Sequence, residues 1–319
     1  MSWRPTATRA ALQRRAWMLA RARGFLASRG MLEVDTPVVV NAAVTDTHIH
    51  SAEVRFPGSG AQFFLHTSPE YAMKRLLAAG SGDIFQICHV TRALERGRVH
   101  NAEFTLIEWY RLGFSLEQLM EEVAALVREI RCRSSDLPSS DFPDVLTYRD
   151  VFLRELAVDP LAASLAELQR IAVSCGFESA DRDELLDFLM VTHIGPKLGH
   201  HALTFIHRYP ASQAALAQID PKDSRCALRF ELYGNGIELA NGFKELASPH
   251  EQRARFEQDN RQRRARGLPE IEIDERFLDA LDSGLPDCAG VALGFDRLVM
   301  LATGAKHIDE VLPFPIERA

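Results

Sequence analysis

The sequence predicts an α+β fold built on an antiparallel β-sheet. Strand-like segments come first, helical segments lie between them, and strand-like segments return further along the chain. This order favours antiparallel strands over the alternating βαβ units of a wound sheet. Apolar residues make up 46 % of the 319 residues and no internal repeat interrupts the pattern, so a sizeable core is expected.

The N-terminal third is predicted to contain two helices and a long hairpin. Apolar residues recur at helical spacing over 8–28 and predict the first helix. Ser68 as the N-cap and Pro69 as the first helical residue predict the second, which runs to Gly80. Strand patterns occur at 31–40, with a break at Pro37, and at 54–56, 62–66, 83–88 and 103–110. The last two strands are expected to form an antiparallel hairpin.

The central part is predicted to combine helices with a second hairpin. A capping box at Ser115-x-x-Gln118 predicts a helix to about Cys132, and a Ser-, Asp- and Pro-rich loop follows over 133–146. Helical patterns occur near 147–155, 164–175 and 181–193, and we expect a helical insertion over about 147–195. Strand patterns return at 202–209, 226–233 and 235–240, with Gly234-Asn235-Gly236 as the turn of a hairpin.

The C-terminal part is predicted to contain two more helices around a strand. Ser248 and Pro249 open a very polar helix to Gly267, whose charged residues we expect to face solvent. A strand of small residues over 288–295 precedes a helix that starts at Asp296.

Composition excludes several classes of protein. The net charge of −7 argues against a protein that coats nucleic acid. The five cysteines lie far apart without a C-x-x-C pair, which suits a reducing cytosol and predicts neither disulfides nor a zinc cluster. The sequence has neither the apolar core of a secretory signal nor an 18-residue apolar run. We therefore expect a cytoplasmic protein, and an enzyme.

Several common catalytic motifs are absent from the sequence. It contains no phosphate loop of the G-x-x-x-x-G-K-[ST] type, no G-x-S-x-G and no H-E-x-x-H. His193, His200 and His201 lie near one another, but no cysteine or acid completes a metal-ligand pattern there. A P-loop nucleotide site, an α/β-hydrolase site and a zinc site are therefore not expected.

Charged residues inside otherwise apolar strands indicate a ligand site. Glu108 lies within the apolar run Leu106–Trp109, and Glu231 and Glu238 flank the tight turn of a hairpin, so their carboxylates can approach each other. Buried charges cost several kcal/mol by order of magnitude unless they are paired or bind a ligand. A salt bridge is an alternative for any single residue, but it does not account for the whole set.

Three segments resemble the motifs of class II aminoacyl-tRNA synthetases of the lysyl type. The helix before Pro37 is similar to motif 1, the hairpin from Phe85 to Tyr110 to motif 2, and Gly290–Leu301 to motif 3; ELANGF at 238–243 lies between the last two. The resemblance covers the whole chain. It is closest to truncated relatives of lysyl-tRNA synthetase, a family of ligases that attach (R)-β-lysine to elongation factor P.

This resemblance implies the fold, the reaction and the partners. It implies one class II catalytic domain over residues 1–319, with an antiparallel sheet flanked by helices and without the anticodon-binding domain of the synthetases, so stable tRNA binding is not expected. It implies a homodimer built by motif 1. It also implies that ATP and Mg²⁺ activate (R)-β-lysine as an adenylate, which a lysine ε-amine of elongation factor P then attacks.

The resemblance assigns the nucleotide site residue by residue. Arg92 and Arg297 are the catalytic residues: Arg92 holds the α-phosphate and the attacking carboxylate, and Arg297 reaches the γ-phosphate and covers one face of the adenine. Arginine suits this task because it binds phosphate oxygens in pairs. Magnesium is assigned to Glu231 and Glu238. The residues assigned to ATP are Arg92, Ala93, Leu94, Glu95, His100, Asn101, Phe104, Glu238, Leu239, Gly294 and Arg297.

The resemblance also assigns a pocket for a substrate with two amines. Glu70 matches the acid for the amine nearer the carboxylate, and Glu108, Tyr110 and Glu245 match the residues around the distal ammonium. Asn241 matches a contact to the substrate carboxylate, and Ala292 stands where lysyl synthetases have glycine. The added methyl favours a β-amino acid, although one methyl is worth only about 1–3 kcal/mol. The residues assigned to this substrate are Ser68, Pro69, Glu70, Glu108, Tyr110, Asn241, Glu245 and Ala292.

One departure from the family pattern leaves alternatives open. The family reads Arg-x-Glu in motif 2, whereas this chain reads Arg92-Ala93-Leu94-Glu95. One residue reverses the side-chain direction on a strand, so either the chain bulges to bring Glu95 back or Leu94 leaves a contact unmade. The alternative functions are a lysyl-adenylate or lysyl-tRNA synthetase-like enzyme acting on α-lysine, and a non-catalytic sensor of an amino acid.

Overall fold

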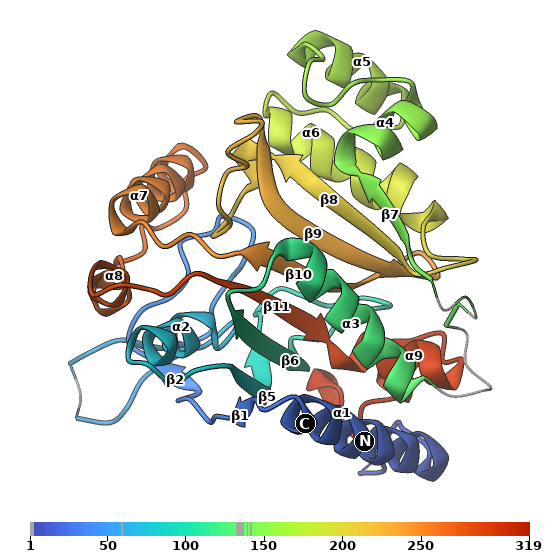
Figure 1. Cartoon of the computed structure of the whole chain (residues 1–319), viewed down its shortest axis with the longest axis vertical. Coiled ribbons are helices and arrows are strands. Elements are labelled where there is room, and N and C mark those ends of the chain that lie inside the picture. Colours follow the sequence, from blue (N-terminus) through green and yellow to red (C-terminus); the bar gives the residue numbers. More distant parts are fainter. Residues whose placement is uncertain (1–2, 59, 132–136, 139, 141) are drawn as a thin grey trace. The chain divides into compact units, whose positions relative to one another are not determined.

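The computed structural model describes the chain except residues 1–2, 59, 132–136, 139 and 141 (Figure 1). The chain divides into two compact units, which are taken in turn. Unit 1 comprises Met1–Phe114 and Leu246–Ala319, and unit 2 comprises Ser115–Glu245. Helices flank a mainly antiparallel set of strands in each unit, in agreement with the predicted α+β class.

Unit 1 is built around the predicted long hairpin. Strands β5 (Ile84–Thr91) and β6 (Glu103–Leu112) pair antiparallel over eight residue pairs. Strand β11 (Cys288–Gly294) pairs antiparallel with β6, and the short β1 (Leu32–Glu33) pairs parallel with β5. A separate small sheet contains β2 (Val39–Val40), β4 (Phe63–Leu65) and β3 (Glu53–Val54).

Five α-helices accompany the described strands of unit 1. Helix α9 packs on β6, α1 packs on α9, and α8 packs on both α2 and α7. Thr8 caps the first helix, because its hydroxyl accepts from the Ala11 N–H at 3.1 Å. The bounds are α1 Arg9–Ser28, α2 Glu70–Ala78, α7 Pro249–Ala265, α8 Glu275–Asp282 and α9 Phe295–Thr303, followed by the 3₁₀ turns η4 Ile308–Glu310 and η5 Ile316–Arg318.

Unit 2 places a group of helices against four strands (Figure 1). Strands β10 and β9 pair antiparallel, as do β9 and β8, whereas β7 pairs parallel with β8. The strands are β7 Asp144–Thr147, β8 Thr204–Pro210, β9 Cys226–Gly234 and β10 Ile237–Lys244. The helices are α3 Leu116–Ile130, α4 Tyr148–Leu156, α5 Leu165–Ser174 and α6 Arg182–Leu189, with a π turn η1 Met190–Ile194 and 3₁₀ turns η2 Gly195–Lys197 and η3 Ala211–Gln213.

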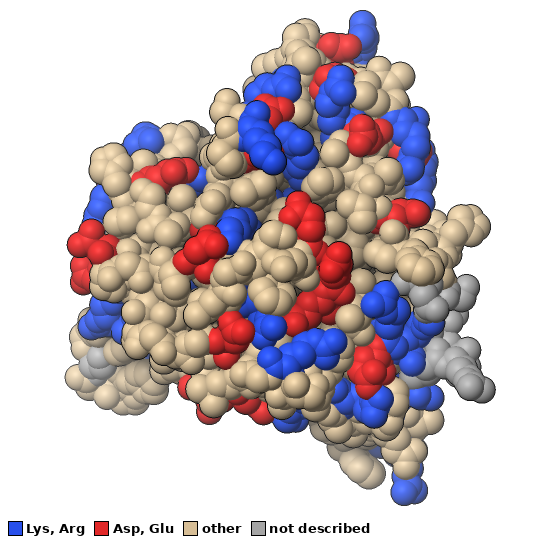
Figure 2. Space-filling view, in the orientation of Figure 1, with Lys and Arg blue, Asp and Glu red and all other residues tan. Residues whose placement is uncertain are grey.

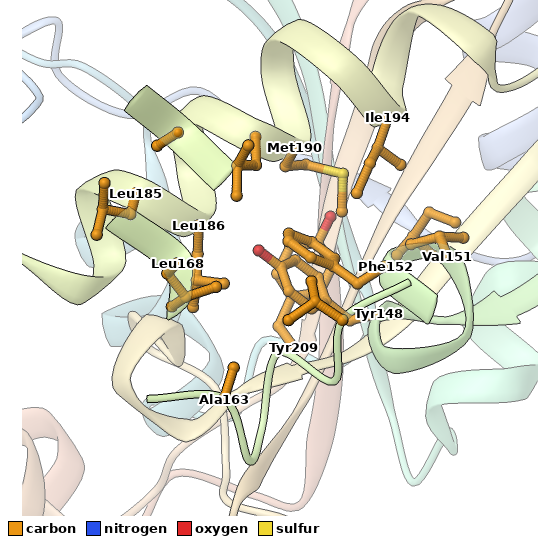
Figure 3. Packing of buried hydrophobic residues seen from close by; sticks show 14 of the residues in the cluster. Tyr148, Val151, Phe152, Ala163, Leu168, Leu185, Leu186, Met190, Ile194 and Tyr209 are labelled. Atoms are coloured by element: carbon orange, nitrogen blue, oxygen red, sulfur yellow. The ribbon is translucent and has the colours of Figure 1, made fainter. Parts of the chain in front are cut away.

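A core of aromatic and aliphatic residues holds α4, α5 and α6 to the strands of unit 2 (Figure 3). The Tyr148 ring lies 4.6 Å from the Phe152 ring and 4.8 Å from the Tyr209 ring, measured between centroids. Tyr209 and Tyr233 belong to this cluster although they come from strands β8 and β9. The helices predicted from the sequence thus bury their apolar faces on one side of the β8–β9 pair.

The turn between β9 and β10 has the geometry predicted for Gly234-Asn235-Gly236. Asn235 and Gly236 have φ angles of 49° and 73°, the left-handed conformation of a two-residue hairpin turn. A Cβ atom on Gly236 would lie 2.9 Å from the Pro196 carbonyl oxygen, so glycine is also required for space.

The structure corrects several local predictions. The second helix begins at Glu70, one residue later than predicted, and Pro69 occupies the cap position. The segment 31–40 contributes two short strands to different sheets instead of one interrupted strand. Helix α8 was not predicted, and β7 begins inside the predicted loop 133–146. The predicted helix end at Cys132 and part of that loop lie outside the described residues.

Helix α7 is less exposed than its polar sequence predicts. The Gln252, Asn260 and Arg263 side chains are buried. The Arg263 Nε–H donates to the Pro269 carbonyl at 2.7 Å, and the Asn260 amide exchanges hydrogen bonds with the backbone of Ile271. Asn260 and Arg263 are buried here because each satisfies backbone groups of a neighbouring segment.

Candidate active site

One face of the β5–β6–β11 strands carries several of the predicted site residues, among them Phe104 of β6. Strand register places Glu108 opposite Ala292, and Tyr110 opposite Gly290. Directly paired residues lie on the same face, so Glu108, Tyr110, Ala292 and Gly294 share it. From residue 290 onward β11 presents only glycine and alanine on this face, so its backbone is open to close approach by a ligand.

Glu108 is a buried carboxylate on this face. It is 2 % exposed, and its Oε1 accepts a hydrogen bond from the Tyr110 hydroxyl at 2.7 Å. Residues 108 and 110 point the same way because they are two positions apart on β6. The structure therefore brings together two of the residues assigned to the distal ammonium of the substrate.

The opposite face of β6 is fixed to two helices by a buried ion pair. The Asp296 carboxylate, at the start of α9, accepts from the Thr105 N–H at 2.7 Å and from the Arg15 guanidinium of α1. Arg15 also donates to the Thr105 hydroxyl at 2.6 Å. This contact fixes the start of α9 and therefore the backbone of the next residue, Arg297. The sequence signal for it was a charged Asp-Arg pair directly after an apolar strand.

Arg92, Glu95, His100 and Arg297 form a cluster at the loop end of the motif 2 hairpin. The Arg92 Nη1 lies 3.2 Å from the Glu95 Oε1, and its guanidinium carbon lies 5.2 Å from the centre of the Phe104 ring. The Arg297 Nη2 lies 2.6 Å from the His100 Nε2. Two guanidiniums, one of them next to an aromatic ring, can bind a polyphosphate and stack on a base.

His100 is neutral in this cluster. Burial lowers its pKa from the usual value, and the Arg297 and Arg92 charges lower the pKa further, while the Glu95 charge acts in the opposite direction. Because arginine has only donors, the His100 Nε2 must accept from Arg297, and the ring proton is on Nδ1. Within the described part of the chain, the buried Arg92 Nε–H has no hydrogen-bond acceptor, so this arginine still has a donor for an incoming anion.

The extra residue between Arg92 and Glu95 is absorbed by a turn. The Glu95 N–H donates to the Arg92 carbonyl at 3.1 Å, which closes a β-turn over Ala93 and Leu94. The Leu94 side chain points outward and is 74 % exposed, while the Glu95 carboxylate folds back onto Arg92. Of the two alternatives left by the sequence, the structure shows the one in which the chain bulges.

The C-terminal segment holds the rest of the motif 2 loop in place. Arg96 forms a two-pronged ion pair with Asp309, at 3.0 and 2.9 Å, and a further contact of 2.5 Å with Glu317. The Ile308 N–H donates to the Arg98 carbonyl, and the Ile316 N–H donates to the Asn101 Oδ1 at 3.2 Å. Sequence reasoning missed these contacts, because the partners lie more than 200 positions apart.

Ser68, Pro69 and Glu70 line a pocket at the start of α2. Residues 40–44, Ser51 and His66 form other walls of this pocket. The Ser68 hydroxyl accepts from the Glu70 N–H, and the Glu70 carboxylate pairs with the fully buried Lys74 ammonium at 2.7 Å. Glu70 thus already binds an ammonium group, the kind of partner that the resemblance assigns to it.

The remaining predicted residues lie in unit 2. Strand register places Glu231 opposite Asn241 and Glu238 opposite Tyr233, so the two carboxylates are diagonal neighbours on one face of the hairpin. Leu239 occupies the irregular position where the register shifts, and its side chain is buried. Glu245 follows the end of β10 and is 2 % exposed; the Gln218 side chain donates to its carbonyl at 2.9 Å.

Glu231 is held by two donors that the sequence did not reveal. The Arg229 Nη2 donates to its Oε1 at 2.6 Å, and the Tyr233 hydroxyl donates to its Oε2 at 2.7 Å. Burial raises the pKa of Tyr233 well above its ordinary value, and the charges of Glu231 and Glu238 raise this pKa further. The hydroxyl therefore keeps the proton that it donates.

The described residues contain no group of three or more His, Cys, Asp or Glu side chains that could hold a metal ion. A carboxylate pair is nevertheless sufficient for magnesium, which is bound by one or two carboxylates together with substrate phosphates. Glu231 and Glu238 fit that pattern. Although both Glu231 oxygens accept a hydrogen bond, each has a second lone pair for a cation.

Comparison with known proteins identifies the family. The model of the class II tRNA synthetases (D, K and N) matches residues 1–318, so the chain belongs to the class II tRNA synthetase family. It is 48 % identical to each of three proteins named elongation factor P–(R)-β-lysine ligase, from Klebsiella pneumoniae, Salmonella typhi and Proteus mirabilis. The alignments cover 100, 100 and 99 % of this chain and 98 % of each relative. The predicted resemblance is confirmed.

Membership in this family implies the use of ATP. In the part of the chain that the structure describes, no helix is both long and apolar enough to cross a membrane.

Proposed function

We propose that this protein is an ATP-dependent ligase that activates (R)-β-lysine and transfers it to a lysine ε-amine of elongation factor P. The observation that carries the proposal is the cluster of Arg92, neutral His100 and Arg297 on a class II motif 2 hairpin. Relatives that match the whole chain are named for this substrate and this acceptor. Binding of ATP alone would not indicate which amino acid is activated. The names of these relatives support (R)-β-lysine.

The first step joins the substrate carboxylate to the α-phosphorus of ATP. A new phosphorus–oxygen bond forms, the bond to the bridging oxygen breaks, and pyrophosphate leaves. Arg92 would hold the carboxylate and the α-phosphate together, so that two anions can meet, and Arg297 would bind the γ-phosphate. Phe104 and Arg297 would cover the adenine faces, and the backbone of residues 93–95, Asn101, Leu239 and Gly294 would border the nucleotide.

The second step passes the acyl group to the acceptor. The ε-amine attacks the carbonyl carbon of the mixed anhydride, an amide bond forms, and AMP leaves. No nucleophile of the enzyme is required. Glu70, Glu108, Tyr110 and Glu245 would bind the two ammonium groups of (R)-β-lysine, and the Ala292 methyl next to Glu108 would favour the β-amino form.

Magnesium is proposed at Glu231 and Glu238. When bound, it would neutralise phosphate charge. We further propose that the protein is a homodimer formed through α1, that it has no stable contact with tRNA, and that it acts in the cytoplasm.

The test is pyrophosphate exchange into ATP with (R)-β-lysine and α-lysine measured side by side, followed by the mass of elongation factor P after incubation with the enzyme. We expect exchange to be faster with (R)-β-lysine, and elongation factor P to gain one β-lysyl group. Exchange with α-lysine alone, together with charging of tRNA, would instead identify a lysyl-tRNA synthetase-like enzyme. Binding of amino acid without any exchange would identify a sensor.

A further inference from the structure

Arg229 lies at the centre of a polar network on strand β9. Besides its contact with Glu231, its Nε–H donates to the Asn241 Oδ1 at 3.2 Å and its Nη1 donates to the Gln213 carbonyl at 2.8 Å. The guanidinium also lies over the Tyr209 ring, 4.4 Å from its centre. All three of its nitrogens therefore have a partner in the strands and turns of unit 2.

The contact with Arg229 decides which way the Asn241 amide faces. An asparagine side chain can rotate by half a turn and exchange its oxygen for its nitrogen at almost the same position. Arginine offers only donors, so Asn241 must turn its oxygen toward Arg229. Its NH₂ group consequently points away from Arg229, with two donors available on the far side of the amide.

The ring of Tyr209, part of the unit 2 core, restricts the movement of the guanidinium. Tyr209 supports its flat face and belongs to the buried cluster with Tyr148 and Phe152 (Figure 3). The side chain of Arg229 is 17 % exposed, and that of Glu231 is 10 % exposed. Because protein cores are packed almost as densely as crystals, a guanidinium held in this way has one position.

We propose that Arg229 is a positioning residue that orients the Asn241 amide as a donor toward the substrate carboxylate and fixes the rotamer of Glu231. This inference rests on the proposed function, because it needs a substrate carboxylate at Asn241. Arg229 itself contacts neither substrate nor nucleotide. Its effect on the reaction passes through the two side chains that it holds.

The exchange Arg229→Lys tests this role. Lysine keeps the positive charge next to Glu231 but has a single donor group, so it cannot reach Glu231, Asn241 and the Gln213 carbonyl together. We expect the affinity for (R)-β-lysine, measured by calorimetry without ATP, to fall about tenfold. In exchange assays we expect KM for the amino acid to rise by a similar factor. We expect kcat and the KM for ATP to change less than threefold, because the Tyr233 hydroxyl still donates to Glu231 and the lysine keeps a positive charge beside it.

Arg225→Lys is the matched control. Arg225 precedes the same strand, is exposed and pairs with Asp223 at 2.8 Å. We expect this variant to bind the amino acid like the parent protein. If both exchanges weaken binding equally, or if Arg229→Lys does not weaken it at all, the positioning role is wrong.

A second readout needs no substrate. With ¹⁵N-labelled asparagine, the Asn241 side-chain NH₂ signals are identified by their loss in Asn241→Asp. We expect these signals to move in Arg229→Lys and to stay in place in Arg225→Lys. Unchanged Asn241 signals in Arg229→Lys would overturn the inference, even if the protein proves to act on another amino acid. Failure of the parent protein to bind or activate either lysine isomer would instead overturn the proposed function.

Discussion

Arg92 and Glu95 are held together by a turn and not by neighbouring positions on a strand. The ion pair survives the extra residue because the turn over Ala93 and Leu94 reverses the chain between its two partners. Both side chains are little more than one quarter exposed, so solvent screens the pair only in part. The Glu95 carboxylate therefore restrains the Arg92 guanidinium before any substrate arrives.

We expect Glu95→Gln to lower kcat/KM for ATP about tenfold, which corresponds to about 1.4 kcal/mol of transition-state stabilisation. The neutral amide leaves Arg92 free to adopt other rotamers, so ordering this side chain reduces the free energy gained when ATP binds. Pyrophosphate exchange at varied ATP concentration measures the effect. Glu103→Gln is the control, because Glu103 pairs with His89 at the exposed start of β6. Equal activities of the two variants would refute the restraint.

Asp259 is a second residue whose environment matters, because its surroundings shift the pKa of its carboxyl group. Burial raises its pKa from 3.8 to about 6; the hydrogen bond from Thr45, at 2.5 Å, acts in the opposite direction, and the nearby Asp46 charge raises the pKa again. A carboxyl with a raised pKa binds its proton more tightly in the folded state. Its contribution to stability is therefore greatest below pH 3.8 and is lost as the pH rises through about 6.

We expect Asp259→Asn to increase the free energy of unfolding at pH 8 by about 2 kcal/mol, allowing for its partial exposure. The amide can still accept from Thr45 but does not bury a charge. The gain should shrink as the pH falls from 6 toward 3.8, where the wild-type carboxyl is protonated in both states. Urea unfolding at several pH values measures it, with the exposed Glu257→Gln as the control. A gain that is independent of pH would contradict this explanation.

At the scale of elements, the C-terminal segment (residues 308–318) restrains the motif 2 loop through ion pairs and hydrogen bonds. Arg96 pairs with Asp309 and Glu317, and Asn101 accepts from the Ile316 backbone. The loop between these points includes His100, which contacts Arg297. A loop that is fixed at both ends requires little ordering when a nucleotide binds.

We expect Asp309→Asn to raise the KM for ATP about three- to tenfold without a comparable change in the KM for the amino acid. The exchange weakens the two-pronged ion pair and allows the loop to move. Kinetics at varied concentrations of each substrate distinguish the two effects. The control is Asp282→Asn at the exposed end of α8. An unchanged KM for ATP would show that the loop keeps its shape without the Arg96–Asp309 ion pair.

Elements with strong local signals were predicted well. Helix α3 has the predicted capping box, because this signal depends only on residues within one turn of the helix start. The β9–β10 hairpin follows from Asn235-Gly236, whose left-handed conformation sets the register. Helix α8 was missed, although Asp274 caps it and Phe277, Leu278 and Leu281 form a short apolar face. Eight residues give too few repeats for a clear helical pattern.

The sequence predicted which residues belong to the site, but not which contacts hold them. Motif spacing named Arg92, His100, Arg297 and Glu231, but their partners depend on contacts between distant segments. Arg229 reaches Asn241 across a hairpin, and Asp296 binds Arg15 from the other end of the chain. No local pattern encodes such a pair, because either partner alone reads as an ordinary surface charge.

At the scale of the whole molecule, the distribution of charge and one exposed aromatic side chain bear on the proposed partners. Figure 2 shows Lys and Arg side chains interspersed with Asp and Glu side chains over the face in view. This mixed surface, together with the net charge of −7, suits a protein acceptor better than a polyanion such as tRNA. Helix α1 carries Trp17, which is 42 % exposed and lies near the guanidiniums of Arg14 and Arg21.

We expect Trp17→Glu to raise the dissociation constant of the proposed dimer at least about 30-fold, because buried aromatic anchors dominate interfaces. Sedimentation at several protein concentrations measures it. Trp3→Glu is the control, since Trp3 is 83 % exposed and precedes the helix. A parent protein that is monomeric at every concentration would rule out the dimer.

The turn over Ala93 and Leu94 has a consequence for how relatives are recognised. A search for arginine and glutamate at fixed spacing would reject this chain, although the two side chains meet as an ion pair. Chemistry constrains the separation of the charged groups in space, and a loop can accommodate different numbers of residues between them. Criteria for membership in such a family should therefore test whether the charges meet in three dimensions before a chain is classed as inactive.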